Sequence, residues 1–132
     1  MNIGMDELFF LVSFNDDDHG KAVNYVTNRR DWQQMLVAAR ANGWEPRGTI
    51  LDYECHYQLE VSKHEEIDRD FQALIDRDVR ERCAKWQGGY LAPEYQIVTD
   101  EDAMGLRKAL HRVNAPLDLL MFLSHGAFRI AA

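Results

Sequence analysis

Short apolar runs, separated by polar clusters, mark the first part of the chain. The run Glu7–Phe14 is rich in β-forming residues and predicts a strand. Both of its faces are apolar, with Leu8, Phe10, Val12 and Phe14 on one and Phe9 and Leu11 on the other. We therefore expect both sides of this strand to be covered by other parts of the protein.

A hairpin and a helix are predicted next. Asn15–Gly20 contains the residue types that form turns, and Ala22–Thr27 follows it as a return strand. Asn28–Gly43 predicts a helix, because Asn28 can cap its start and Gly43 can end it. The buried side of that helix should be the stripe Trp32, Met35, Leu36 and Ala39.

The clearest periodicity lies in Ile50–Val61, where apolar and polar residues alternate. Period two predicts a half-buried strand with one wet face. That face would carry Asp52, Glu54 and His56 in a row, which could hold a divalent ion or supply a pair of carboxylates. A solvated sheet face explains the same three residues without any ligand.

The second half of the chain predicts a long helix and then a short strand. Ser62 and Glu65 form a capping box, and the helix that they begin stops by Gly88-Gly89. Its outer face should carry ion pairs at helical spacing, such as Asp76–Arg80. Tyr95–Val98 then predicts a short strand.

Two further helical segments complete the pattern. Thr99 caps the first, and three carboxylates in its first turn complement the helix dipole: Asp100, Glu101 and Asp102. Capping is a sufficient reason for all three. Leu117–Ser124 predicts the second segment, after which Phe128 and Ile130 fold back onto the core.

These elements predict one α+β domain over residues 1–132. Three or four helices should pack on one face of a small, mainly antiparallel sheet. The alternative is a mostly helical domain with one hairpin. A chain of 132 residues of which 46% are hydrophobic can bury one main core.

Net charge limits the kinds of partner that the protein can bind, and cysteine content indicates its cellular compartment. The formal net charge of −7 repels a phosphate backbone, so we expect no nucleic-acid partner. Two cysteines, Cys55 and Cys83, are fewer than a small secreted protein normally carries, which indicates reduced thiols in the cytoplasm. No apolar run is long enough to span a membrane.

Candidate chemistry is sparse. Neither cysteine has a catalytic signature around it, and the histidines lack the spacing of a zinc site. We therefore expect no catalytic residue, no metal and no cofactor. The remaining candidates are Trp44, Trp86 and Tyr90, which lie beside Gly and Pro and could line a ligand groove or anchor a partner. Filling the core is the other interpretation of these rings.

Three motifs resemble those of a family of small uncharacterised bacterial proteins. They are the GWxPxGT pattern of residues 43–49, the WxGxY pattern of residues 86–90 and the QxVTxxDA pattern of residues 96–103. The resemblance implies a shared fold. It carries over no activity, cofactor or catalytic residue.

Two classes of function remain. The first is a non-enzymatic protein-interaction or regulatory module whose partner is another protein. An acidic inhibitor or immunity-type partner of a basic protein is one form of this class. The second is a small-ligand-binding protein or minor enzyme that uses Trp44, Trp86 and Tyr90, with Asp52, Glu54 or His56. The sequence leaves the oligomeric state open.

Overall fold

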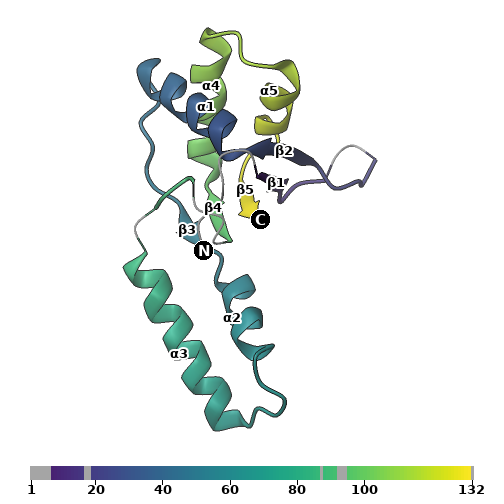
Figure 1. The fold of residues 1–132 in the computed structure, drawn as a ribbon, viewed down its shortest axis with the longest axis vertical. Helices are drawn as coiled ribbons and strands as arrows, with labels where there is room; N and C mark the ends of the chain where they lie inside the picture. Colours follow the sequence, from purple (N-terminus) through teal and green to yellow (C-terminus); the bar gives the residue numbers. More distant parts are fainter. Residues whose placement is uncertain (1–6, 17–18, 87, 92–94, 132) are drawn as a thin grey trace.

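A computed structural model describes residues 7–16, 19–86, 88–91 and 95–131. These residues form five helices and one five-stranded antiparallel sheet (Figure 1), which confirms the predicted α+β class. In chain order, the elements are β1 (Leu8–Ser13), β2 (Asn24–Asn28), α1 (Arg29–Ala41), β3 (Ile50–Leu51), α2 (Tyr53–Val61), α3 (Arg69–Lys85), β4 (Gln96–Val98), α4 (Asp100–Arg112), α5 (Leu117–Leu123) and β5 (Phe128–Ala131).

The strands lie in the order β2-β1-β5-β4-β3. The last strand of the sequence, β5, is therefore the middle strand of the sheet. Its Ile130 is opposite Leu11 of β1 on one side and Gln96 of β4 on the other. We expected Phe128 and Ile130 only to fold back onto the core. The strand itself was missed, because four residues are too short a run to show a period.

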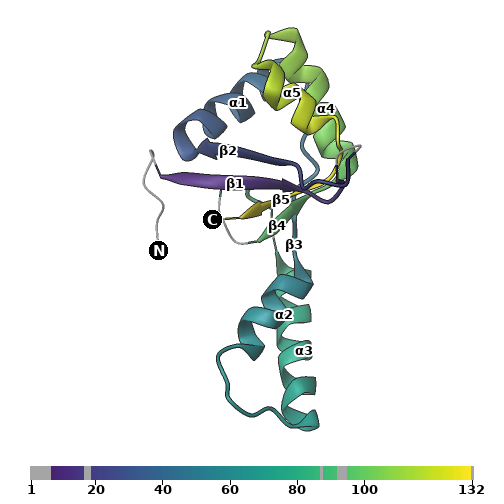
Figure 2. The same cartoon turned by 90° about the vertical axis from the view of Figure 1, so that its right-hand side faces the viewer.

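Helices α1, α4 and α5 cover one face of this sheet (Figures 1 and 2). Asn28 caps α1 as predicted, since its side chain accepts the N–H of Asp31 at 2.8 Å. The core between helices and sheet is built from apolar side chains of both layers: Leu11, Trp32, Leu36, Ala39, Val98, Ala103, Leu106, Leu110, Leu119, Phe122, Phe128 and Ile130. Three helices thus supply one layer and the sheet supplies the other.

No helix among the described residues covers the second face of the sheet. The strand register places Phe10 beside Val26, and Val12 beside Arg129, on the side away from the three helices. We call this surface the open face and define it by Leu8, Phe10, Val12, Phe14, Val26, Ile50, Ile97 and Arg129. The expectation that both sides of β1 are covered is wrong, because Leu11 is fully buried while Leu8 is 64% exposed. The alternation within a strand does not reveal whether a second layer exists.

Helices α2 and α3 form a hairpin that projects beyond the sheet (Figure 2). We call residues 53–85 the arm. The arm extends from the β3 edge on the side opposite α1, α4 and α5. Its two helices pack on each other, and only Ile75 and Val79 of α3 are buried among the residues of the two helices.

The predicted strand Ile50–Val61 is wrong beyond Leu51. Strand β3 ends there because its partner β4 is only three residues long. The Asp52 side chain then accepts the N–H of Cys55 at 3.2 Å and begins α2. A helix bonds its own backbone groups, so it needs no neighbouring strand where the sheet has none to offer.

The predicted start of the next helix is also wrong. Ser62 ends α2, and its hydroxyl donates to the carbonyl of Leu59 at 2.7 Å in place of capping a new helix. Asp68 is the N-cap of α3, where its side chain accepts the N–H of Phe71 at 2.8 Å. Ser62 and Glu65 have the spacing of a capping box, but the helix begins at the cap six residues later, Asp68. The predicted Asp76–Arg80 ion pair does form, at 3.0 Å.

One ion pair ties the base of the arm to the centre of the sheet. Arg129 of β5 donates through Nε to the carboxylate of Asp52 at 2.6 Å. The Asp52 side chain is almost fully buried, whereas that of Arg129 is about one-third exposed. Asp52 therefore caps α2 and anchors it at the same time.

Replacing Asp52 can separate these two roles. Asparagine still caps a helix but cannot pair with Arg129, so Asp52→Asn should lower the free energy of unfolding by roughly 1–3 kcal/mol. Asp52→Ala also removes the cap and should lower it by about 1 kcal/mol more. Urea denaturation measures both, with Glu54→Gln on the exposed surface of α2 as the matched control. An Asp52→Asn loss no larger than that of the control contradicts the anchoring role.

Candidate functional site

The three aromatic residues predicted as a binding site are built into the protein interior and its margin. Trp44 is 5% exposed, and its ring meets that of Tyr90 edge to face at a centroid distance of 5.1 Å. Its indole N–H donates to the backbone carbonyl of Asp102 at 3.2 Å. The structure therefore places Trp44 in the core.

Tyr90 connects the chain segments around Trp44. Its hydroxyl donates to the Asp102 carboxylate and accepts the backbone N–H of Gly48 at 2.9 Å. The backbone carbonyl of Tyr90 also accepts the indole N–H of Trp32 at 2.8 Å. Burial, together with the hydrogen bond to Asp102, raises the pKa of Tyr90 well above its usual value. The phenol stays protonated and is no candidate for a general base near neutral pH.

Asp102 has a role that sequence reasoning missed. Only 2% of this residue is exposed, and its carboxylate also accepts the backbone N–H of Arg47 at 3.0 Å. Thr99 caps the helix as predicted, since its hydroxyl oxygen accepts the N–H of Asp102 at 3.3 Å. Helix capping thus accounts for the position of Asp102 in the first turn but not for its burial. A buried carboxylate with two partners from distant segments joins those segments.

Trp86 belongs to a second chain of hydrogen bonds beside the first. Its indole N–H donates to the hydroxyl of Thr49 at 3.0 Å, and that hydroxyl donates to the side-chain carbonyl of Gln96. The Gln96 amide in turn donates to the carbonyl of Gly89. Gly88 lies so close to the Thr49 backbone that a Cβ atom there would clash.

We call these two adjacent chains together the clasp: Trp44, Thr49, Trp86, Tyr90, Gln96 and Asp102. The clasp joins the three sequence motifs of residues 43–49, 86–90 and 96–103. Their Gly, Trp, Gln and Asp residues hold the connector after α1, the segment after α3 and the start of α4 together. The arrangement is a structural joint in which the polar atoms of all three rings are already bonded to the protein.

A surface cavity of about 500 Å³ lies next to Trp44, between the connector and α4. Its walls include Trp44, Met104 and Lys108, and an exposed ion pair crosses its margin, with Arg47 2.5 Å from Glu101. Of the predicted aromatic residues, only Trp44 lines it. The structure brings Trp44 and Tyr90 into contact, but it does not arrange the three rings around one groove.

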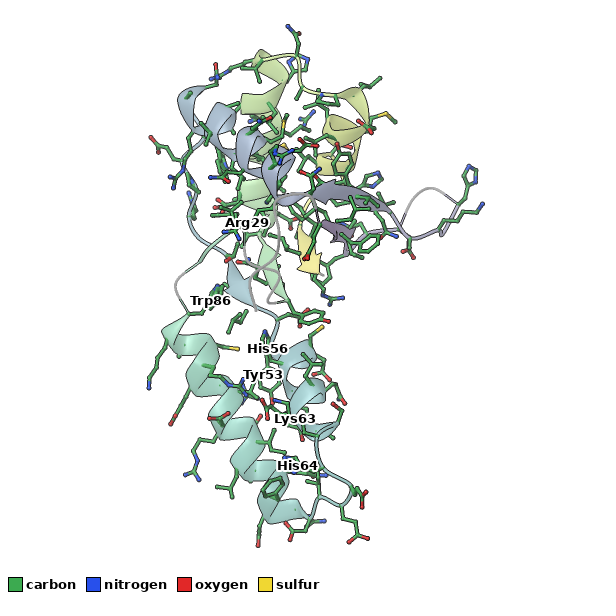
Figure 3. All side chains as sticks on the ribbon, viewed as in Figure 1. Arg29, Tyr53, His56, Lys63, His64 and Trp86 are labelled. Carbon is green, nitrogen blue, oxygen red and sulfur yellow. The ribbon has the colours of Figure 1, made fainter. Side chains whose placement is uncertain are left out.

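The row Asp52, Glu54 and His56 is not formed, because these residues lie on or before a helix and not along a strand. Asp52 is paired with Arg129, while Glu54 accepts the side-chain amide of Gln58 at 3.2 Å. His56 lies at the base of the arm (Figure 3), and its ring meets that of Tyr95 edge to face at a centroid distance of 6.3 Å. In the part of the chain that the structure describes, no group of three or more His, Cys, Asp or Glu residues is placed to hold a metal ion.

The thiols offer no activated nucleophile. Burial raises the pKa of Cys55, and the hydrogen bond from its Sγ to Asp52 at 3.3 Å raises it further. Burial likewise raises the pKa of Cys83. Because only the thiolate is a strong nucleophile, both side chains are less reactive than a free cysteine at neutral pH.

The open face is the surface that sequence reasoning missed. Its exposed apolar side chains are Leu8 (64%), Phe10 (44%), Phe14 (48%), Val26 (48%) and Ile50 (53%). Of the strand residues that the structure describes, the register places a single charged side chain on this face, Arg129. That side chain is paired with Asp52, and its guanidinium lies 4.9 Å from the ring centroid of Phe14. The signal was present in the β1 pattern, which was apolar on both faces.

The arm adds a second, partly exposed cluster near its base. Tyr53 stacks on Tyr57 at 5.8 Å, and the Arg80 guanidinium lies over the Tyr53 ring at 4.7 Å. The Tyr53 hydroxyl donates to Asp76, and Arg80 donates to the same carboxylate at 3.0 Å. Tyrosine and arginine are the side chains that most often anchor protein interfaces.

Comparison with protein-family models, with curated proteins and with solved structures gives no match for this chain. Among the described residues, no helix is both long and apolar enough to cross a membrane.

The hydrogen bonds of Tyr90 in the clasp should make the free energy of unfolding depend on pH. The pKa of Tyr90 is raised in the folded state. The stabilisation that results is therefore fully present at any pH below the pKa of about 10 that a tyrosine has in the unfolded chain. This stabilisation declines at higher pH, because Tyr90 then loses its proton in the unfolded chain before it does so in the folded protein, and that favours unfolding. Tyr90→Phe should lower the free energy of unfolding by about 1–3 kcal/mol at neutral pH, and this difference should shrink from about pH 10 upward.

Denaturant unfolding of both proteins between about pH 8 and pH 11 measures the effect. Tyr57→Phe on the surface of α2 serves as the control for the loss of one phenol. A wild-type advantage that stays constant over this range would show that Tyr90 is not held in its protonated form.

Proposed function

We propose that this protein is a non-enzymatic protein-interaction module that binds its partner on the open face. The observation that carries the proposal is the set of five large apolar side chains exposed together on one side of the sheet. Scattered exposed apolar residues are normal on a soluble protein, but a contiguous patch of this kind is characteristic of a binding surface.

The area of the patch supports this role. The five side chains present on the order of 500 Å² of apolar surface, near the upper end for the largest patch of a typical monomer. At roughly 25 cal/mol per Å², covering that surface contributes on the order of 10 kcal/mol before the costs of association are subtracted. A protein partner is large enough to cover the whole patch.

The chemistry of the face indicates an apolar partner. Arg129 is the charged side chain on the face, and it is already neutralised by Asp52. The net charge of −7 is therefore carried mainly outside this surface. An acidic inhibitor of a basic protein would concentrate its carboxylates at the contact, so the electrostatic form of the interaction hypothesis is less supported than a hydrophobic one.

Binding of a small ligand near Trp44, Trp86 and Tyr90 is the alternative, and the geometry supports it less. The polar atoms of these rings are bonded to Asp102, Thr49 and Gly48. A ligand would have to break those bonds to use the same groups. The surface cavity beside Trp44 could admit a small molecule without this rearrangement, but the predicted aromatic set does not line it.

Site-specific photo-crosslinking in the native cells tests the proposed surface. A benzophenone side chain at position 10 or 26 should crosslink to a protein, because both positions lie within the open face. The same group at Met121, which is 59% exposed on α5, is the matched control. Crosslinking from the open face alone supports the proposal. Equal crosslinking from Met121, or none from the open face, refutes it.

A further inference from the structure

We propose that the protein bound on the open face is a second copy of this chain, packed sheet against sheet about a two-fold axis. This inference rests on the proposed function and specifies its partner. A two-fold interface uses the same surface on both subunits, so that surface must be complementary to itself.

The open face meets this condition electrostatically. A chain with a net charge of −7 repels its own copies, but the two faces would bring no unpaired like charges together. The side chains that meet would be mainly aliphatic and aromatic: Leu8, Phe10, Val12, Phe14, Val26, Ile50 and Ile97. Branched and aromatic side chains on two facing sheets interdigitate, as they do in a sheet sandwich.

The surface of the isolated chain is large for its mass. A compact monomer of 15.3 kDa exposes about 7,100 Å², whereas this chain exposes 8575 Å². A stable interface buries about 800 Å² on each partner, more than the five exposed side chains of the open face provide. The arm must therefore take part if the dimer is to be stable.

The position of the arm allows it to do so. It projects on the same side of the sheet as the open face (Figure 2). The 17 residues of α3 span about 25 Å, whereas packed sheets lie only about 10 Å apart. An arm of this length is long enough to reach past the plane of the partner's sheet. The Tyr53, Tyr57 and Arg80 cluster on the arm supplies side chains suited to this contact.

A two-fold axis parallel to the strands would place each arm beside the partner's β2, because the arm leaves from the opposite edge, at β3. In the sheet formed by the described residues, β2 is an edge strand and pairs only with β1. Ser13 N–H bonds to the carbonyl of Val23, so the alternating groups of Asn24 and Val26 point away from β1. The strand reads Asn-Tyr-Val-Thr-Asn and lacks the charges or proline that usually protect an edge.

The test measures the molar mass of the purified protein by light scattering and sedimentation over a range of concentrations. We expect twice the chain mass for the wild type, with a Kd that Phe10→Asp and Val26→Asp each weaken by at least about tenfold. Met121→Asp on the helical side introduces the same charge at a similarly exposed residue and should leave the Kd unchanged. Circular dichroism establishes that each variant is folded.

Hydrogen exchange of the wild type provides a readout that needs no variant. The amides of Asn24 and Val26 should exchange more slowly as the protein concentration rises, because the partner's arm covers the β2 edge. A monomer at all concentrations overturns the self-association proposal, as does a dimer that Met121→Asp weakens while Phe10→Asp does not. The crosslinking experiment decides independently whether the open face binds a protein at all.

Discussion

The architecture depends on the pairing of β5 with strands on both of its sides. Without it, β1–β2 and β3–β4 would be separate two-stranded units, which are at best marginally stable in water. Successive side chains of β5 point to opposite faces of the sheet. Phe128 and Ile130 enter the core under the helices, while Arg129 points to the open face and holds Asp52. One short strand thus closes the sheet, fills the core and anchors the arm.

The clasp likewise holds distant segments together: the connector after α1, the segment after α3 and the start of α4. Asp102 and Gln96 are buried polar side chains, and each has a hydrogen-bond partner in the connector after α1, far away in the sequence. Burial of such groups is favourable only when they are satisfied, and a satisfied network fixes one arrangement of the segments that it joins. Trp44, Trp86 and Tyr90 therefore stabilise the fold through hydrogen bonds within the chain. Their hydrogen-bonding capacity is used within the chain.

The two faces of the sheet are consequently very different. Three helices and the clasp complete one face, and none of the described elements completes the other. The arm, which contains α2 and the longest helix of the protein, α3, extends away from the core in place of covering the open face. A fold that leaves both an apolar sheet face and a thinly packed helical hairpin in water exposes surface that a second chain can bury.

The α+β class, the first hairpin, α1, β4 and the start of α4 could be predicted from the order of the residues alone. These depend on local signals: turn residues at 15–20, the caps Asn28 and Thr99, and apolar stripes at helical spacing. Local alternation also misled, since Ile50–Val61 has the period of a strand. This segment becomes a helix because β4 is three residues long and offers no further backbone groups to pair with, which depends on the packing of the whole chain.

The tertiary structure alone also decided which surfaces are buried. The pattern of β1 shows two apolar faces, but the number of layers that cover a sheet depends on where distant helices pack. The same holds for Trp44, Trp86 and Tyr90, whose residue types suit a core and a binding groove equally. Their placement was fixed by Asp102 and Gln96, which sequence position identifies only as a helix-cap neighbour and a strand residue. Burial and pairing between distant segments are properties of the whole fold, and a local pattern cannot specify them.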